Sequence, residues 1–343
     1  MNWPEFLSSL VRGEDQPAEA TAWAMEQILN GDATPVQMAG FVVGLRSKGE
    51  TVEELTGLAD IMIEFATPIE IGGPAVDVVG SGGDRSNTVN ISTMAAIVAA
   101  AAGARVVKHG NRAASSACGA ADVLEALGVV LDLAPEVQQQ VVDQVGIGFL
   151  FAAQYHPALR HASVMRRELG IPTIFNFLGP LANPAQPISQ AVGVADSRMA
   201  ELMAGVFASR GNYGLVVRGD DGLDELTTTT SSTVWVYADG GVVRTELDPL
   251  QLGVPRASIA DLVGGDAMAN AQVVREVVAG RPGPIRDVVV LNTAAALVAY
   301  GKPAAGRLAD DFADGLERAR QAIDAGAAQT KLQEWIEVTQ SLR

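Results

Sequence analysis

Residues 74–103, PAVDVVGSGGDRSNTVNISTMAAIVAAAAG, decide the fold of this chain. The first seven residues form a short apolar run that predicts a β-strand, and a glycine-rich turn follows. Residues 90–103 are rich in alanine and end at Gly103, which predicts a helix with a glycine stop. A strand, a glycine loop and a helix in this order are the unit from which α/β proteins are built.

The same order then repeats along the chain. Residues 105–110, RVVKHG, predict a second strand, and residues 120–128, AADVLEALG, predict a second helix. Such alternation is typical of a mainly parallel sheet covered by helices. Residues 232–247, STVWVYADGGVVRTEL, contain an Asp-Gly-Gly turn and predict an appended antiparallel hairpin. Further strands are expected at residues 146–151 (GIGFLF), 189–194 (SQAVGV), 213–219 (YGLVVRG) and 286–291 (RDVVVL).

The first 70 residues contain helical patterns only. Apolar residues recur at helical spacing in residues 17–32, 34–50 and 51–68. Thr51 and Glu54 predict a capping box at the start of the last of these helices. Short helices with apolar stripes need a partner, which is either the rest of the chain or a second copy of it. We therefore expect an α/β protein with a small N-terminal α-helical domain.

Composition limits the kinds of partner. The chain has 343 residues and a formal net charge of −16, which works against nucleic acid or an anionic membrane as partners of the whole surface, although a local basic pocket remains open. The single cysteine, Cys118, cannot form an intrachain disulfide and is typical of the reducing cytoplasm. The start of the chain lacks a signal-peptide pattern, and the longest apolar run is too short to span a bilayer. We expect a soluble cytoplasmic protein.

Two loops that follow predicted strands have anion-binding features. In residues 80–93, GSGGDRSNTVNIST, glycines let backbone N–H groups approach an anion, and the next helix start adds a positive dipole end. Residues 108–122, KHGNRAASSACGAAD, add the charges of Lys108 and Arg112 and the hydroxyls of two serines. In open α/β sheets, ligands bind at such loops. Two in succession suit a substrate with phosphates at two separated places.

Neither loop is a standard phosphate motif. A dinucleotide-binding GxGxxG pattern would need glycine at position 85, which is Arg85, and the pattern GxxxxGK[ST] does not occur. A tight strand-to-helix turn remains the alternative interpretation of the first loop. A solvated basic turn remains the alternative for the second.

A third stretch, residues 219–232 (GDDGLDELTTTTSS), places four carboxylates within six residues. Carboxylate oxygens suit Mg²⁺, which is commonly shared with substrate phosphates. A solvated acidic turn is the alternative, but the two anion-binding loops favour a metal. With only three histidines and one cysteine in the chain, a zinc site is not expected.

These three stretches, together with residues 166–184 (RRELGIPTIFNFLGPLANP), resemble the four signatures of the anthranilate phosphoribosyltransferase family, in the family's order. The resemblance spans nearly the whole chain. It implies a helical domain at residues 1–72, joined by helical segments around 166–186, and a larger α/β domain at residues 73–165 and 187–343. It also implies a site in the cleft between the domains and a homodimer that forms through the helical part.

The reaction implied by the resemblance is the Mg²⁺-dependent transfer of phosphoribose from phosphoribosyl pyrophosphate (PRPP) to anthranilate in tryptophan biosynthesis. PRPP carries a 5′-phosphate and a 1′-pyrophosphate, which accounts for two anion loops. Ser92 with Glu225 would bind one Mg²⁺, and Asp224 with Glu225 a second, whereas Asp220 and Asp221 would be a polar turn. The residues implied to bind PRPP are Gly80, Gly83, Asp84, Thr88, Asn90, Ile91, Ser92, Thr93, Lys108, His109, Gly110, Asn111, Arg112, Ala113, Ala114, Ser115, Ser116 and Ala120.

The resemblance also implies an anthranilate site. Arg166 would pair with the anthranilate carboxylate, because a planar guanidinium suits that task better than lysine does. Alternatively, Arg166 and Arg167 only end a helix favourably. The other residues implied at this site, of which the histidines and the proline could equally be packing residues, are Gly80, Asn111, His109, His156 and Pro180. No residue is expected to act as a covalent nucleophile, and none is assigned as a general base.

Three positions depart from the family pattern. Ser81 stands where threonine is common, and Cys118 and Ala120 stand where serine is common, so Ala120 removes one hydroxyl from the second loop. We expect Cys118 to fill a small-residue position. Two rival functions remain: a pyrimidine nucleoside phosphorylase-like enzyme, and a nucleic-acid-binding relative without activity. The net charge and the acidic stretch argue against the second rival.

Overall fold

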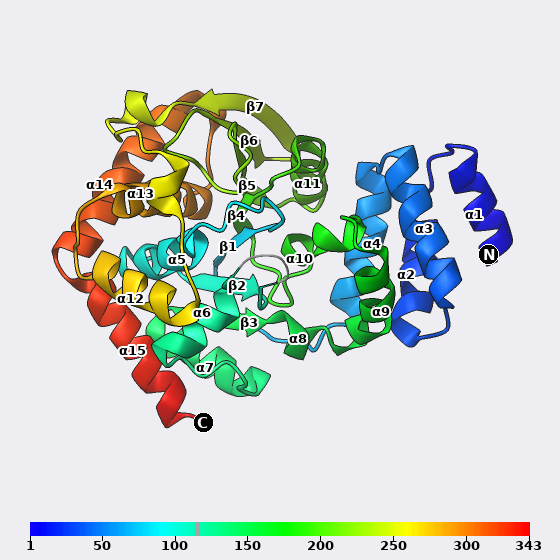
Figure 1. Cartoon of the computed structure of the whole chain (residues 1–343), viewed down its shortest axis with the longest axis horizontal. Coiled ribbons are helices and arrows are strands. Elements are labelled where there is room, and N and C mark those ends of the chain that lie inside the picture. The colour runs from blue at the N-terminus through cyan, green and yellow to red at the C-terminus, as the bar shows by residue number, and fades with distance from the viewer. Residues whose placement is uncertain (114–116) are drawn as a thin grey trace.

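The computed structural model of the chain describes residues 1–113 and 117–343, and it contains one seven-stranded sheet with helices on both faces and a separate group of N-terminal helices (Figure 1). The strands are β1 (Val76–Gly80), β2 (Val106–Gly110), β3 (Ile147–Phe151), β4 (Ser189–Gly193), β5 (Tyr213–Gly219), β6 (Ser232–Ala238) and β7 (Gly241–Leu247). The helices are α1 (Trp3–Val11), α2 (Ala18–Asn30), α3 (Pro35–Lys48), α4 (Val52–Glu64), α5 (Ile91–Ala101), α6 (Ala120–Leu127), α7 (Pro135–Val145), α8 (Ala152–Tyr155), α9 (Arg160–Leu169), α10 (Leu178–Leu181), α11 (Ser197–Ser209), α12 (Ala267–Val278), α13 (Pro284–Tyr300), α14 (Leu308–Asp324) and α15 (Ala327–Ser341).

The sheet confirms the predicted parallel architecture. Its strand order is β3-β2-β1-β4-β5-β6-β7, with β1 to β5 parallel and the last two strands antiparallel. The hairpin between β6 and β7 is also confirmed. Its turn residues Asp239 and Gly240 have φ angles of 51° and 78°, the left-handed conformation that a two-residue hairpin turn requires.

Helices α5 and α13 form the core on one face of the sheet, where α13 packs on α5, α14 and β4 (Figure 1). The prediction of a strand at residues 286–291 is wrong, because this segment belongs to α13. The helix is buried on all sides from Val288 to Ala299, so this stretch is apolar except for Asn292 and Thr293 and lacks the helical period. Its 17-residue length and Pro284 in its first turn are the features that indicate a helix.

The N-terminal helices begin where the sequence predicts. Both Thr34 and Thr51 form capping boxes, with Gln37 and Glu54 respectively. Helices α2 and α4 cross so closely that a methyl group at Gly57 would overlap the backbone of α2. The later helix α9 packs on α2 and α3, and α10 packs on α4, so residues far along the chain complete this bundle. No helix among the described residues is long and apolar enough to cross a membrane.

Candidate active site

From β1 the chain adds β2 and β3 on one side of the sheet, and then β4 and β5 on the other side. The loop after β5 lies across the ends of β1 and β4, where this change of side occurs. Gly80 ends β1 and Gly193 ends β4, side by side in the sheet register. A Cβ atom at either glycine would overlap Asp224, with its carboxylate at Gly80 and with its carbonyl oxygen at Gly193. The Gly82 N–H also donates to the Asp224 carboxylate over 2.6 Å. The two glycines thus allow the acidic loop to lie across the strand ends, where open α/β sheets bind ligands.

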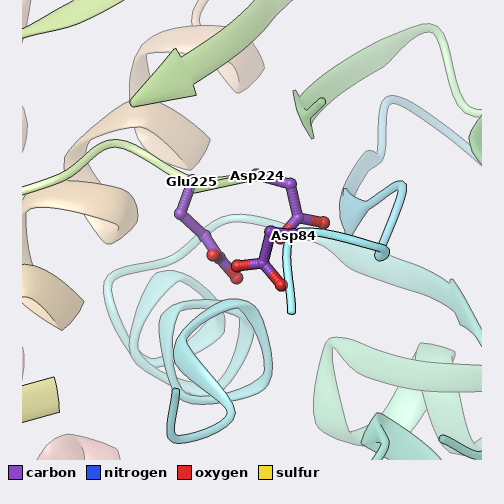
Figure 2. A group of neighbouring side chains, drawn as sticks. All are labelled: Asp84, Asp224 and Glu225. Carbon is purple, nitrogen blue, oxygen red and sulfur yellow. The ribbon is translucent and has the colours of Figure 1, made fainter. Parts of the chain in front are cut away.

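Three carboxylates meet at this point. Oxygen atoms of Asp84, Asp224 and Glu225 lie within 4.8 Å of one another, and Figure 2 shows their side chains converging from two loops. Burial, together with the neighbouring Asp84 charge, raises the pKa of Asp224 to about 6. Burial and the Asp224 charge raise the pKa of Glu225 well above its usual range. The structure therefore adds Asp84 to the predicted acidic pair.

The cluster fits a divalent cation by its chemistry. All the donors are hard carboxylate oxygens, and the Oε2 atom of Glu225 is buried without a hydrogen-bond partner among the described residues. A divalent cation would offset the burial and repulsion that raise the pKa values of Asp224 and Glu225. Asp220 and Asp221 do not join the cluster. Instead, the carboxylate of Asp221 accepts hydrogen bonds from Thr227 and Thr229, which confirms a polar turn.

Lys108 is the buried cation beside this cluster. Its side chain is 2% exposed, and its Nζ atom donates to the carbonyl of Val78 and, over 3.2 Å, to the Ser92 hydroxyl. Burial lowers the pKa of Lys108 to about 8, while the charges of Asp77, Glu225 and Asp224 act in the opposite direction. Ser92 is therefore held close to the acidic cluster through Lys108.

The second of the two predicted anion-binding loops, residues 108–122 (the second phosphate loop), keeps its basic side chain paired. Arg112 forms ion pairs with Asp122 over 3.0 Å and with Glu125 over 2.6 Å, on the first turns of α6. The Asp122 carboxylate also accepts hydrogen bonds from the N–H groups of Ala113 and Gly119, so it closes the loop on the helix that follows. The predicted residues Ala114, Ser115 and Ser116 lie outside the described residues.

The remaining predicted residues of this loop are backbone positions or short side chains. Asn111 is exposed, and its side-chain oxygen accepts a hydrogen bond from the Arg112 N–H. A Cβ atom at Gly110 would lie 2.8 Å from the Phe149 ring, so only glycine fits there. Ala120 is the first residue of α6. At this helix start, the Gly119 N–H is bonded to Asp122 and the Ala121 N–H to the carbonyl of Asn111.

The first of the two predicted anion-binding loops, residues 80–93 (the first phosphate loop), is held in place by backbone pairing. Thr88 forms an isolated β-bridge with Val263, and the Gly83 φ angle of 88° favours glycine. Ile91 and Thr93 at the start of α5 are buried, and the Thr93 hydroxyl has no hydrogen-bond partner among the described residues. The Asn90 side chain donates to the carbonyl of Cys118 and accepts from the side chain of Asn270.

Two buried histidines lie on the opposite face of the sheet. Their ring centroids are 5.2 Å apart, His109 Nδ1 lies 3.0 Å from the carbonyl oxygen of Gly179, and His156 Nε2 lies 2.9 Å from that of Ala182. Because a carbonyl oxygen can only accept, these ring nitrogens carry the protons. Burial, with the nearby His156, lowers the pKa of His109 to about 3, so it is neutral. The buried Pro180 lies between the two carbonyl partners in sequence.

Arg166 belongs to the helical part of the protein. It lies on α9 and its guanidinium carbon is 5.5 Å from the centroid of the Phe175 ring. Burial lowers the pKa of Arg166 from its ordinary value, but an arginine stays charged at neutral pH. A planar cation beside an aromatic ring suits an aromatic carboxylate.

Sequence reasoning missed Asp77 and Asn183. Asp77 is fully buried in β1, and its carboxylate accepts hydrogen bonds from the His109 N–H over 3.1 Å and from the Asn183 side chain over 2.8 Å. Burial raises the pKa of Asp77 to about 6. An acidic residue inside the apolar run PAVDVVG was a usable signal, because carboxylates are seldom buried without a partner. Asn183 lies in the family signature at residues 166–184, but nothing in the sequence distinguishes it from its neighbours.

Comparison with known proteins agrees with this geometry. The glycosyl transferase family α/β domain matches residues 72–329, and the helical bundle domain of the same family matches residues 4–66. An anthranilate phosphoribosyltransferase from Thermobifida fusca is 56% identical over 339 residues, which cover 99% of this chain and 97% of that protein.

Solved structures show the same fold. The anthranilate phosphoribosyltransferase of Thermus thermophilus has a TM-score of 0.90 and 37% identity, and the match covers 98% of this chain and 99% of that one. The Saccharomyces cerevisiae enzyme, solved in complex with PRPP and Mg, has a TM-score of 0.89 and 25% identity over 99% of this chain and 98% of that one. The matches to both domains of the glycosyl transferase family show that the chain belongs to that family. Within this class, the chain belongs to the anthranilate phosphoribosyltransferase family.

The acidic cluster predicts an unusual pH dependence for the metal-free protein. The pKa of Asp224 rises from 3.8 to about 6 on folding, so its contribution to stability is present below pH 4 and is lost as the pH rises through 6. We therefore expect Asp224→Asn to raise the thermal unfolding midpoint of the metal-free protein, and the gain over wild type should grow between pH 4 and pH 7. Calorimetry with EDTA measures this. Asp220→Asn, which changes an exposed carboxylate of the same turn, is the control. A gain that is the same at every pH would contradict the assignment.

Proposed function

We propose that this chain transfers the phosphoribosyl group of PRPP to the amine of anthranilate, with Mg²⁺, and releases pyrophosphate in tryptophan biosynthesis. The observation that carries this is the acidic cluster of Asp84, Asp224 and Glu225 at the strand ends, next to two anion-binding loops. A cation held by carboxylates beside phosphate loops suits a pyrophosphate-bearing substrate. The related S. cerevisiae enzyme in complex with PRPP and Mg supports the same substrate and metal.

The chain's own residues have an electrostatic and positional role in this reaction. As the bond from C1′ to pyrophosphate breaks, negative charge grows on the leaving group. We propose that the backbone at Gly83 and the ammonium of Lys108, which donates to the Ser92 hydroxyl, face that charge, whereas the Gly82 N–H is already bonded to Asp224. We propose two Mg²⁺ ions: Ser92 with Glu225 would hold one, and Asp224 with Glu225, together with the neighbouring Asp84, the other. When bound, the ions would neutralise pyrophosphate oxygens.

The amine of anthranilate needs little activation, because an aromatic amine already has a nucleophilic lone pair. Positioning is then the main task. We propose that Arg166 binds the anthranilate carboxylate and that Asn111 and the backbone at Gly80 face the amine. The buried ring pair of His109 and His156 would line the approach, together with Pro180. Since the pKa of His109 is lowered to about 3, this imidazole cannot attract the carboxylate by charge, which leaves that role to Arg166.

The division of the chain follows from this assignment. We propose a helical domain of residues 1–72 with segments around 166–186, and a catalytic α/β domain of residues 73–165 and 187–343. The packing of α9 on α2 and α3 supports the first group. We propose that Arg166 faces the phosphate loops across a cleft between the two domains. We place the protein in the cytoplasm, in line with its single cysteine.

We also propose a homodimer formed through the helical domain. Helix α3 is apolar on its outer side as well as its inner side: Val36 is 81% exposed and Val43 37% exposed, two turns apart on the same face. Val11, at the end of the neighbouring α1, is 83% exposed. Exposed valines in a row on a paired-helix surface suit a self-complementary contact.

The activity itself can be measured by the loss of anthranilate fluorescence with PRPP. We expect wild type to consume anthranilate only with Mg²⁺, and Asp224→Ala with Glu225→Ala to lower the rate by a factor on the order of 10² or more. Asp220→Ala, on the same turn, should keep the wild-type rate. Failure of wild type to consume anthranilate with both substrates and metal saturating would reject the proposal. Phosphorolysis of pyrimidine nucleosides in its place would indicate the phosphorylase.

The role of Arg166 predicts a selective effect on one substrate. Because the guanidinium is assigned to the anthranilate carboxylate, Arg166→Lys and Arg166→Ala should raise the KM for anthranilate about tenfold or more, with the KM for PRPP nearly unchanged. Arg167→Ala alters the exposed neighbouring residue and should leave both constants unchanged. Equal changes in the two KM values, or a matching effect of Arg167→Ala, would show that Arg166 only supports the helix.

The dimer can be tested by sedimentation velocity at micromolar concentration. We expect wild type to sediment as a dimer and the double variant Val36→Asp with Val43→Asp as a monomer, since two carboxylates would be buried in the contact. Leu250→Asp places the same charge at an exposed apolar residue of the α/β domain, and this variant should remain dimeric. A monomeric wild type would disprove the proposal.

A further inference from the structure

Asn270 is a buried side chain next to both phosphate loops, and the interpretation of the site above gives it no role. It lies in the first turn and a half of α12 and is 2% exposed. The segment that leads to α12 runs along the first phosphate loop: the Val89 N–H donates to the carbonyl of Leu262 over 2.9 Å, and the Gly264 N–H to that of Asn87 over 2.8 Å. Residues 262–264 are thus a backbone segment, the strap, that pairs with the first phosphate loop, and Asn270 follows it in the chain.

The side chain of Asn270 joins this strap to the second loop through one further amide. Its Oδ1 atom accepts from the Gly265 N–H over 2.8 Å, and its Nδ2 atom donates to Asn90 Oδ1 over 2.9 Å. Asn90 Nδ2 in turn donates to the carbonyl of Cys118 over 3.1 Å, one residue before the N–H of Gly119. Three elements that are far apart in the sequence are thus linked by two side chains.

The direction of these hydrogen bonds is fixed at each step. A backbone N–H can only donate, so the Asn270 oxygen must face Gly265 and its nitrogen must face Asn90. A backbone carbonyl can only accept, so the Asn90 nitrogen must face Cys118. Neither amide can flip without losing two bonds. The strap also lies so close to Asn270 that position 264 has no room for a side chain, because a Cβ atom at Gly264 would lie 2.7 Å from the Asn270 oxygen.

We propose that Asn270 is a positioning residue for PRPP, which sets the spacing between the two phosphate loops through Asn90. This inference rests on the proposed function. The residue does not itself reach the substrate: it holds Asn90 in the first loop, and Asn90 holds the backbone at Cys118, near the end of the second. A substrate with phosphates at two separated places binds best when the distance between its two cradles is fixed before it arrives.

The test compares Asn270→Asp with Asn270→Ala. The carboxylate of Asn270→Asp would be nearly the same size as the amide and would still accept from the Gly265 N–H, but it would place an oxygen against Asn90 Oδ1. We expect both variants to raise the KM for PRPP about tenfold, with the KM for anthranilate changed less than about threefold. Gln272→Ala, on the exposed side of the same helix, is the control with wild-type constants.

Two further readouts separate positioning from support of the fold. Calorimetric titration of PRPP with Mg²⁺ in the absence of anthranilate, at a temperature at which circular dichroism shows each variant to be folded, should show the same loss of affinity. The thermal midpoint of Asn270→Asp should fall, because its buried carboxylate faces the Asn90 oxygen, so the PRPP affinity of the folded variant is the deciding readout. Wild-type PRPP affinity in a folded Asn270→Asp, or an equal rise in the KM of both substrates, would overturn the inference. If Asn270→Ala does not fold, Asn270→Asp decides alone. An inactive wild type would reject the proposed function instead.

Discussion

The seating of Asp224 across the ends of β1 and β4 is the constraint on which the site depends. Asp224 lies so close to both strands, with its carboxylate at Gly80 and its carbonyl at Gly193, that neither glycine has room for a side chain. This contact closes the loop of residues 219–232 onto the first phosphate loop, where Asp84 completes the cluster. The arrangement is unfavourable by itself, because it gathers desolvated carboxylates. A divalent cation bound by these carboxylates would remove this repulsion.

A second feature separates the two phosphate loops. Strands β1 and β2 pair at Val76 and Val106. Beyond this pair, the backbone N–H and carbonyl groups that would continue a parallel ladder form hydrogen bonds with side chains instead. Asn183 donates to the Val107 carbonyl, Lys108 donates to that of Val78, and the His109 N–H donates to the carboxylate of Asp77. Buried polar side chains thus replace backbone pairs and let the strands part without unsatisfied groups. Because Asn183 lies in the segment that returns from α10 to β4, the same network ties the two parts of the molecule together.

Much of this fold follows from local patterns in the sequence. Glycine stops, capping boxes and the alternation of short strands and helices depend on near neighbours, and they predicted the parallel sheet, the hairpin and the N-terminal helices correctly. Helix α13 was mistaken for a strand because complete burial removes its polar face. In the site, the loops and the pair Asp224 and Glu225 were predictable, since each lies in a recognisable stretch. The links made by Asp77 and Asn270 were not, because they join residues 32 and 180 positions apart in the chain.

The electrostatics of the site explain how a chain of net charge −16 binds a substrate with a phosphate and a pyrophosphate. Charges on the surface are screened within about 8 Å at physiological ionic strength, so the net charge matters little inside the cleft. The local charges there are opposed: Lys108 attracts phosphate, while the acidic cluster repels it, and Arg112 is already paired with Asp122 and Glu125. Phosphate therefore gains most when a cation covers the carboxylates. Binding of the metal and binding of PRPP should accordingly strengthen each other, because each removes a repulsion that the other would face alone.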